Sequence, residues 1–309
     1  MNPAPPQVNL AAPALSLPAV RKHPTLYASL QEGEVFYGYK LPHNAPFCTS
    51  QQIPSTFVDS IGADSAGTLW VPTSSSAGGF VYSYAPKCGT QGTTLNVPGG
   101  AYAHPLGIAF GRNSTKYVVG INYSTYSGFV AVYPEGDSNP TAELTDPRLN
   151  NGNNPVGVAV RAGKVYVLCC GAYYGYGAPA YIIKFPSEGS QQRGSQIFLK
   201  QLKSPGLSVT FDSARNMIIP DQGTSSIKPA LRIYAPPYSG TPISYPLQGA
   251  SPQCSLSRKQ DSLACADSEN STVDLYSYPS LSYLYSLPVQ TGPSEVPVVG
   301  VAFAASAQQ

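Results

Sequence analysis

Charged residues are scarce in this sequence. Only 11% of the 309 residues are Asp, Glu, Lys or Arg, against about 25% in typical soluble domains. The 18 basic and 16 acidic residues form no long run of one sign. The sequence therefore shows no cluster of basic residues of the kind that binds nucleic acid or an anionic membrane surface. No apolar run approaches the length of roughly 18 residues that a membrane span needs. We therefore expect neither a nucleic-acid partner nor a membrane span.

Residue types that carry catalysis are also few. The chain has three histidines, although histidine is the commonest general base and metal ligand. It has no glycine-rich phosphate loop leading into a helix, no nucleophile elbow and no C-x-x-C or H-E-x-x-H motif. The sequence therefore favours a function without catalysis, and we expect no cofactor.

Tyrosine, proline and glycine are abundant instead. The chain has 22 Tyr, 31 Pro and 29 Gly, a composition typical of short strands separated by turns. Hydrophobic residues make up 42%, which is enough for a sizeable core. Residues 1–23 are rich in Pro and Ala and lack the pattern of a signal peptide. We interpret them as a flexible tether left after removal of an export signal, followed by one domain over 24–304 and a tail over 305–309.

A repeated strand pattern organises the chain. Strands rich in aromatic or β-branched residues close on a proline six times, at Pro42, Pro86, Pro134, Pro186, Pro236 and Pro279, with intervals of 44, 48, 52, 50 and 43 residues. A second strand precedes each of them and begins at Leu26, Leu69, Lys116, Val165, Met217 and Leu263. This repeat length is typical of a four-stranded propeller blade.

An inner strand of small and apolar residues precedes the second strand in five of the repeats. These inner strands are SIGAD (60–64), LGIAF (106–110), VGVAV (156–160), LSVTF (207–211) and QCSLS (253–257). The sixth, VGVAF (299–303), stands near the C-terminal end without a hairpin partner, whereas the first repeat has no inner strand. We therefore predict that the C-terminal strand joins the N-terminal blade and closes a ring, with Val301 beside Tyr27.

The clearest blade signature is GADSAGTLWV (62–71), which combines a small-apolar strand, a D-x-x-G turn and an aromatic strand. In this pattern, residues 24–304 resemble a six-bladed β-propeller with NHL-like repeats, as in the virginiamycin-lyase-like and lactonase propellers. The resemblance implies an all-β fold of six four-stranded antiparallel blades. It also implies that ligands bind at one mouth of the central channel, where second strands end and inner strands begin.

Four of the six cysteines lie at positions that favour disulfides. Cys254 and Cys265 are nearly symmetric about a predicted hairpin turn, so we expect them to face each other. Cys48 and Cys88 occupy similar outer regions of the first two blades, and we expect a second disulfide between them. An even cysteine count with such pairs favours an oxidising compartment. We therefore expect a secreted or extracytoplasmic protein, tethered through its N-terminal segment.

Adjacent cysteines, Cys169 and Cys170, end the second strand of the fourth blade. The Cα spacing of about 3.8 Å across a trans peptide is shorter than the usual disulfide range. The pair is therefore either a strained vicinal disulfide, as an even cysteine count favours, or two buried thiols.

Tyrosines cluster in two adjacent loops of the predicted mouth. Tyr173, Tyr174 and Tyr176 follow the paired cysteines, and Tyr123 and Tyr126 occupy the equivalent loop of the third blade. Tyrosine supplies a large contact area at low entropic cost, which makes it common in binding surfaces; the same rings would also serve simply to cover a wide loop. Our first hypothesis is a monomeric binding propeller that recognises a peptide, glycan or partner protein here.

A second hypothesis is a metal-assisted hydrolase or lyase with its site in the central channel. His104 is the histidine expected at the mouth, and Asp221 and Glu295 are the carboxylates expected there. Asn154, Asp221 and Glu295 would supply three oxygen ligands for a divalent cation if they converge. The lactonase propellers hold a metal in a ring of carboxylates and asparagine, so the resemblance permits this alternative.

Overall fold

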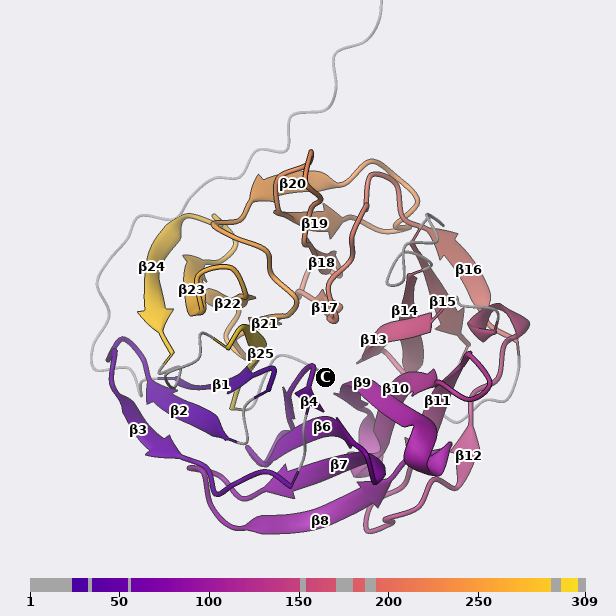
Figure 1. Ribbon diagram of the computed structural model, residues 1–309. Coiled ribbons are helices and arrows are strands. Elements are labelled where there is room, and N and C mark those ends of the chain that lie inside the picture. Colours follow the sequence, from indigo (N-terminus) through magenta and orange to yellow (C-terminus); the bar gives the residue numbers. More distant parts are fainter. Residues whose placement is uncertain are drawn as a thin grey trace, which may run out of the picture.

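The chain forms a ring of six antiparallel sheets around a central axis, as predicted (Figure 1). The computed structural model describes residues 24–32, 35–54, 57–150, 154–170, 180–186, 193–289 and 296–304, without the side chain of Cys170. The fold is thus an all-β, six-bladed propeller. Three short 3-10 helices lie between strands in this part of the chain: η1 (Gly100–Tyr102), η2 (Arg112–Ser114) and η3 (Pro147–Leu149).

Inner strands surround the axis, and second strands pair with their outer sides (Figure 1). From blade 1 to blade 6 the inner strands are β25 (Val298–Phe303), β4 (Phe57–Val58) with β5 (Gly62–Ala63), β9 (Ala103–Phe110), β13 (Asn154–Arg161), β17 (Thr210–Phe211) and β21 (Cys254–Leu256). The second strands are β1 (Thr25–Leu30), β6 (Leu69–Ser75), β10 (Lys116–Asn122), β14 (Lys164–Cys170), β18 (Met217–Asp221) and β22 (Ser262–Asp267).

Third and outer strands complete each blade toward the rim. The third strands are β2 (Phe36–Lys40), β7 (Gly78–Tyr84), β11 (Ser127–Tyr133), β15 (Tyr181–Phe185), β19 (Ala230–Tyr234) and β23 (Thr272–Ser277). The outer strands are β3 (Pro46–Thr49), β8 (Gln91–Asn96), β12 (Ala142–Glu143), β16 (Ser195–Phe198), β20 (Ile243–Pro246) and β24 (Tyr283–Pro288). Among the residues described, no helix has the length and apolar character of a membrane-spanning helix.

The ends of the ring meet in blade 1, where β25 pairs antiparallel with β1. Val301 lies opposite Ala28, one residue from its predicted neighbour Tyr27, which pairs with Ala302. Successive residues of a strand point to opposite faces of the sheet, and both faces of this sheet are buried. A shift of one residue would therefore exchange the side chains that pack on the two faces, which fixes the register. Ala28 and Val301 pack toward blade 6, whereas Tyr27 and Ala302 pack toward blade 2.

The hairpin turn of blade 2 shows why the D-x-x-G pattern folds as it does. Asp64 Oδ1 accepts hydrogen bonds from the backbone N–H of Ala66 and of Thr68, at 3.0 and 2.9 Å. Its Oδ2 accepts a 3.0 Å hydrogen bond from Trp70 Nε1. Gly67 occupies the left-handed region at φ +84°, which glycine adopts without steric cost. One carboxylate therefore closes the turn and orients the tryptophan that follows.

Two predicted disulfides are present. Cys48 and Cys88 join β3 to the turn after β7, and thus link blades 1 and 2, with Cα atoms 5.8 Å apart. Cys254 and Cys265 join directly opposed residues of β21 and β22. Intramolecular disulfides of this kind are typical of oxidising compartments. The predicted Cys169–Cys170 pair lies outside the described residues, because it involves the Cys170 side chain.

Candidate functional site

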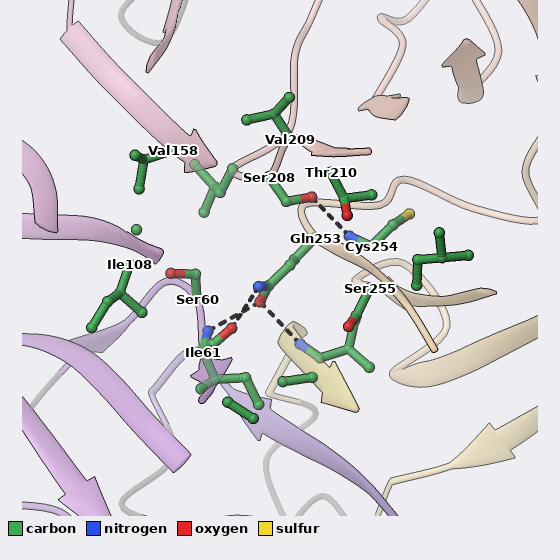
Figure 2. Close-up of a pocket in the computed structure, with 17 residues that line it drawn as sticks. Ser60, Ile61, Ile108, Val158, Ser208, Val209, Thr210, Gln253, Cys254 and Ser255 are labelled. Atoms are coloured by element: carbon green, nitrogen blue, oxygen red, sulfur yellow. Dashed lines mark hydrogen bonds between the residues drawn. The ribbon is translucent and has the colours of Figure 1, made fainter. Parts of the chain in front are cut away.

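The central channel is narrow along the inner strands of all blades. Its cavity has a volume of about 30 Å³, close to the space of one water molecule. Gln253, which precedes β21 in blade 6, extends across it toward blades 1 and 2 (Figure 2). A substrate therefore has no room between the inner strands, and any ligand site belongs at one of the two faces.

The Gln253 side chain forms hydrogen bonds with backbone groups of the blade 2 inner strand that have no partner in an adjacent strand. Its side-chain oxygen accepts hydrogen bonds from Ile61 N and Val301 N, both at 3.0 Å. Its amide nitrogen donates to Ile61 O at 2.7 Å. Ile61 lies in the interruption between β4 and β5, so the glutamine replaces the missing strand pairing there and ties three blades together (Figure 2).

His104 lies near the start of β9, within a partly buried hydrogen-bonded chain that also includes Asp59 and Tyr123. Its Nδ1 is 2.9 Å from the Tyr123 hydroxyl, and its Nε2 contacts the Asp59 carboxylate. Only 15% of the His104 side chain and 6% of the Asp59 side chain are exposed. Both imidazole nitrogens are therefore engaged, and the chain holds Tyr123 in place.

Two aromatic rings near this chain face the solvent. Tyr126 is 67% exposed and Tyr102 is 59% exposed. The Tyr123 backbone N–H donates to Tyr102 O at 2.9 Å, which joins the two loops that carry them. Phe57, on the neighbouring blade, is 40% exposed. We call Phe57, Tyr102, Tyr123 and Tyr126 the aromatic mouth patch.

Asp221, a predicted catalytic and metal-binding residue, is fully buried at the end of β18. Its Oδ2 accepts a hydrogen bond from Arg232 Nε at 2.9 Å and forms an ion pair with Arg232 Nη2, also at 2.9 Å. Its Oδ1 accepts from the Ser204 backbone N–H at 2.9 Å. The carboxylate thus binds an arginine and the neighbouring loop, as a structural cap does.

Asn154, a predicted metal ligand, begins β13 and is 2% exposed. Its Oδ1 has no hydrogen-bond partner among the residues described. No group of three His, Cys, Asp or Glu side chains in the described part of the chain lies close enough together to hold a metal ion. Glu295, Tyr173, Tyr174 and Tyr176 lie outside the described residues, so their roles stay predictions.

A second cavity lies at the face opposite the aromatic mouth patch, and sequence reasoning missed it. It has a volume of about 1200 Å³. It is formed by the turns between inner and second strands of blades 2 to 5, near residues 63–66, 110–114, 160–164 and 215. Lys and Arg recur in these turns, a signal that is visible only once the hairpins are aligned.

No protein-family model matches the chain, and no curated protein matches its sequence. The function therefore has to be inferred from the geometry of the faces themselves.

Proposed function

We propose that this protein is a non-catalytic binding propeller that recognises a peptide segment of a partner protein through the aromatic mouth patch. The observation that carries the proposal is the exposure of Tyr102 and Tyr126, at 59% and 67%, on loops joined by a backbone hydrogen bond. Aromatic residues of this kind are enriched at the centres of protein–protein interfaces.

Loop composition at this mouth supports a peptide ligand. Residues 72–78, 99–103 and 122–127 read PTSSSAG, GGAYA and NYSTYS, without a charged residue. Tyr with Ser, Gly and Asn is also the composition of antibody binding loops, where Tyr provides contact area and the small polar residues provide adaptable hydrogen bonds.

Hydrogen bonds within and beneath the loops support the patch. In the blade 3 loop, the Ser124 N–H donates to Asn122 Oδ1 at 3.0 Å, and Tyr126 adopts a left-handed conformation at φ 51°. His104, which contacts Asp59, also forms a hydrogen bond with the Tyr123 hydroxyl and so holds that ring in place. A preformed surface loses less conformational entropy when a ligand binds, which raises affinity.

A metal-assisted reaction in the channel has weaker support. Of its predicted residues, Asp221 binds Arg232 and His104 binds Asp59 and Tyr123. The inner strands leave a cavity of about 30 Å³, whereas small-molecule sites occupy roughly 300–1,000 Å³. A direct check is metal analysis of the purified protein, together with activity assays on lactones with added divalent ions.

We further propose that the protein works outside the cytoplasm and that its blades are NHL-like repeats. The two disulfides support the first point. The Asp64 turn, which follows the D-x-x-G pattern and orients Trp70, supports the second.

A displayed peptide library and a glycan array together test the proposed function. We expect peptides to bind the wild-type protein and to lose at least about tenfold in affinity in a Tyr102→Ala, Tyr126→Ala variant, because anchor aromatics typically contribute more than 1 kcal/mol each. Phe198→Ala with Tyr283→Ala is the matched control, since these exposed aromatics lie on outer strands.

Three results would contradict the proposal: no peptide binding, binding of glycans alone, or equal loss in the control variant. A separate Tyr173→Ala, Tyr174→Ala variant tests whether the predicted tyrosines of blade 4 extend the same surface.

A further inference from the structure

A second site is visible in the cavity at the opposite face, which we call the basic groove. Its lining includes five cationic side chains from three blades and only two acidic ones. The cationic residues are Arg112, Lys116, Arg161, Lys164 and Arg215, and the acidic residues are Asp64 and Glu135. Only 11% of the residues in the chain are charged, so five cations around one cavity are a large share of the chain's 18 basic residues.

The two ends of the groove differ in how their charges are balanced. At the blade 2–3 end, Lys116 is buried and its Nζ lies 4.8 Å from the centroid of the Trp70 ring. Burial lowers the pKa of Lys116, and the negative charges of Asp64 and Glu135 oppose that fall. The positive charge of Lys116 is therefore balanced by carboxylates of the protein itself.

The blade 4–5 end carries cations that lack such partners. Within the described part of the chain, Arg161, Lys164 and Arg215 form no ion pair. The nearby Asp212 is not ion-paired with these cations. Its buried carboxylate accepts hydrogen bonds from Asn216 and, at 2.6 Å, from the Tyr278 hydroxyl, and its charge contributes to raising the pKa of Tyr238.

Aromatic rings pack among these cations, with Tyr166 and Phe211 buried and Tyr238 half-buried at the cavity. Tyr166, Phe211 and Tyr238 make mutual edge contacts, with centroids 4.8 to 6.3 Å apart. The Arg161 guanidinium lies 5.9 Å from the Phe211 centroid, and the Tyr238 hydroxyl donates to Arg215 O at 3.0 Å. Burial raises the pKa of Tyr166 and of Tyr238, and the charge of Arg161 opposes the rise in both. The Arg161 guanidinium therefore lies close to this group of aromatic rings.

We propose that this end of the groove binds an acidic oligosaccharide, with sugar carboxylates or sulfates on Arg161, Lys164 and Arg215 and a sugar face against Tyr238. A uronic acid carries its carboxylate directly on the ring, which matches cations placed beside an aromatic surface. Guanidinium groups bind such planar anions through paired hydrogen bonds. The cavity, at about 1200 Å³, exceeds the roughly 300–1,000 Å³ of a site for one small molecule, as a chain of several sugars requires.

An acidic peptide fits these observations less well. Its carboxylates stand on flexible methylene groups and bring no ring for Tyr238 to contact, so each bound side chain loses rotamer entropy. We therefore assign the groove to the saccharide and make the peptide an outcome of the test.

The experiment measures binding of an oligogalacturonate to the full chain by calorimetry. We expect binding that weakens as salt rises, because exposed charges are screened, and no comparable binding of the methyl-esterified oligomer of the same length. Arg161→Gln with Arg215→Gln should weaken binding at least about tenfold, since charge-assisted hydrogen bonds are among the strong ones. Lys203→Gln, which removes one positive charge at an exposed position on the opposite face, is the charge-matched control for Arg215→Gln alone.

Several results would overturn the assignment. They are no binding of the oligogalacturonate, equal binding of its neutral ester, no effect of the arginine changes, or tighter binding of an oligoglutamate, which would assign the groove to peptides. If the double variant has a lowered melting temperature, binding is measured with Arg215→Gln alone. Arg215 is exposed, so its replacement leaves the core intact. The Tyr102→Ala, Tyr126→Ala variant should bind the oligogalacturonate normally, so the two proposals fail independently.

Discussion

Gln253 is the residue on which the centre of the ring most depends. It bonds to both backbone groups of Ile61 and to Val301 N inside the channel. We predict that Gln253→Ala lowers the free energy of unfolding by about 2–4 kcal/mol, because it leaves buried backbone groups without partners. Urea denaturation measures this difference. Gln91→Ala, at an exposed position, should change stability by less than about 0.5 kcal/mol; equal effects of the two changes would contradict this role.

Such single-residue roles could be predicted only in part. The repeat predicts an inner strand that begins near His104, and β9 begins at Ala103. It gave no hint of Asp59, 45 residues earlier in the chain, or of Gln253, which bonds to Ile61 across 192 residues. No local pattern encodes either contact. The FVDSIGAD segment (57–64) also has no local signal for the break between β4 and β5, since the pairing that compensates for it comes from blade 6.

Among the elements, the connection between blades 3 and 4 is held by one buried carboxylate. Asp146 caps η3 through Arg148 N at 3.0 Å and accepts from Nε and Nη2 of Arg148 at 2.7 and 2.6 Å. It also accepts from Gly194 N at 3.2 Å, which ties in blade 4. Burial alone would raise the pKa of Asp146, but the bonds from Arg148 and Gly194 outweigh it, so the pKa is lowered.

This lowered pKa predicts a specific pH dependence. A carboxyl group with a depressed folded-state pKa contributes stability above its ordinary pKa of about 3.9, and that stability is lost as pH falls through the folded value. We expect Asp146→Asn to cost about 2–4 kcal/mol at neutral pH and progressively less below about pH 4. Urea unfolding at a series of pH values tests this. A difference that stays constant into acid would be inconsistent with the lowered pKa, and exposed Glu143→Gln serves as the control.

The disulfide between Cys48 and Cys88 acts between elements of two blades. It closes a loop with a sequence separation of 40 residues, whereas Cys254–Cys265 spans only 11. Because longer loops lose more entropy on closure, we predict a loss of about 3–4 kcal/mol for Cys48→Ser with Cys88→Ser, and a smaller loss for Cys254→Ser with Cys265→Ser. Chemical denaturation of both double variants gives the comparison. The reverse order would show that native packing, not loop entropy, decides the contribution.

At the level of the whole molecule, the ring could be predicted because each blade repeats one pattern and the unmatched strands at the two ends complement each other. The basic groove could not, since Arg161, Lys164 and Arg215 come from two hairpins and form no run in the sequence. A search for runs of one charge sign therefore finds nothing at this face. Only the closed ring brings these hairpins together.

Ring closure predicts that the segment over 298–304, which contains β25, is indispensable. Without β25, blade 1 loses its inner strand and β1 presents an open edge. The clusters toward blades 6 and 2 lose Val301, Phe303 and Ala302, and Ser255 Oγ loses its bond from Phe303 N. We expect a chain ending at residue 297 to aggregate or to lack a cooperative thermal transition, while a chain ending at Ala304 folds normally. Adding the 298–304 peptide should restore part of the transition, because strand pairing supplies its own register. A stable, cooperative monomer from the shorter chain would mean that five complete blades hold the sixth without a shared strand.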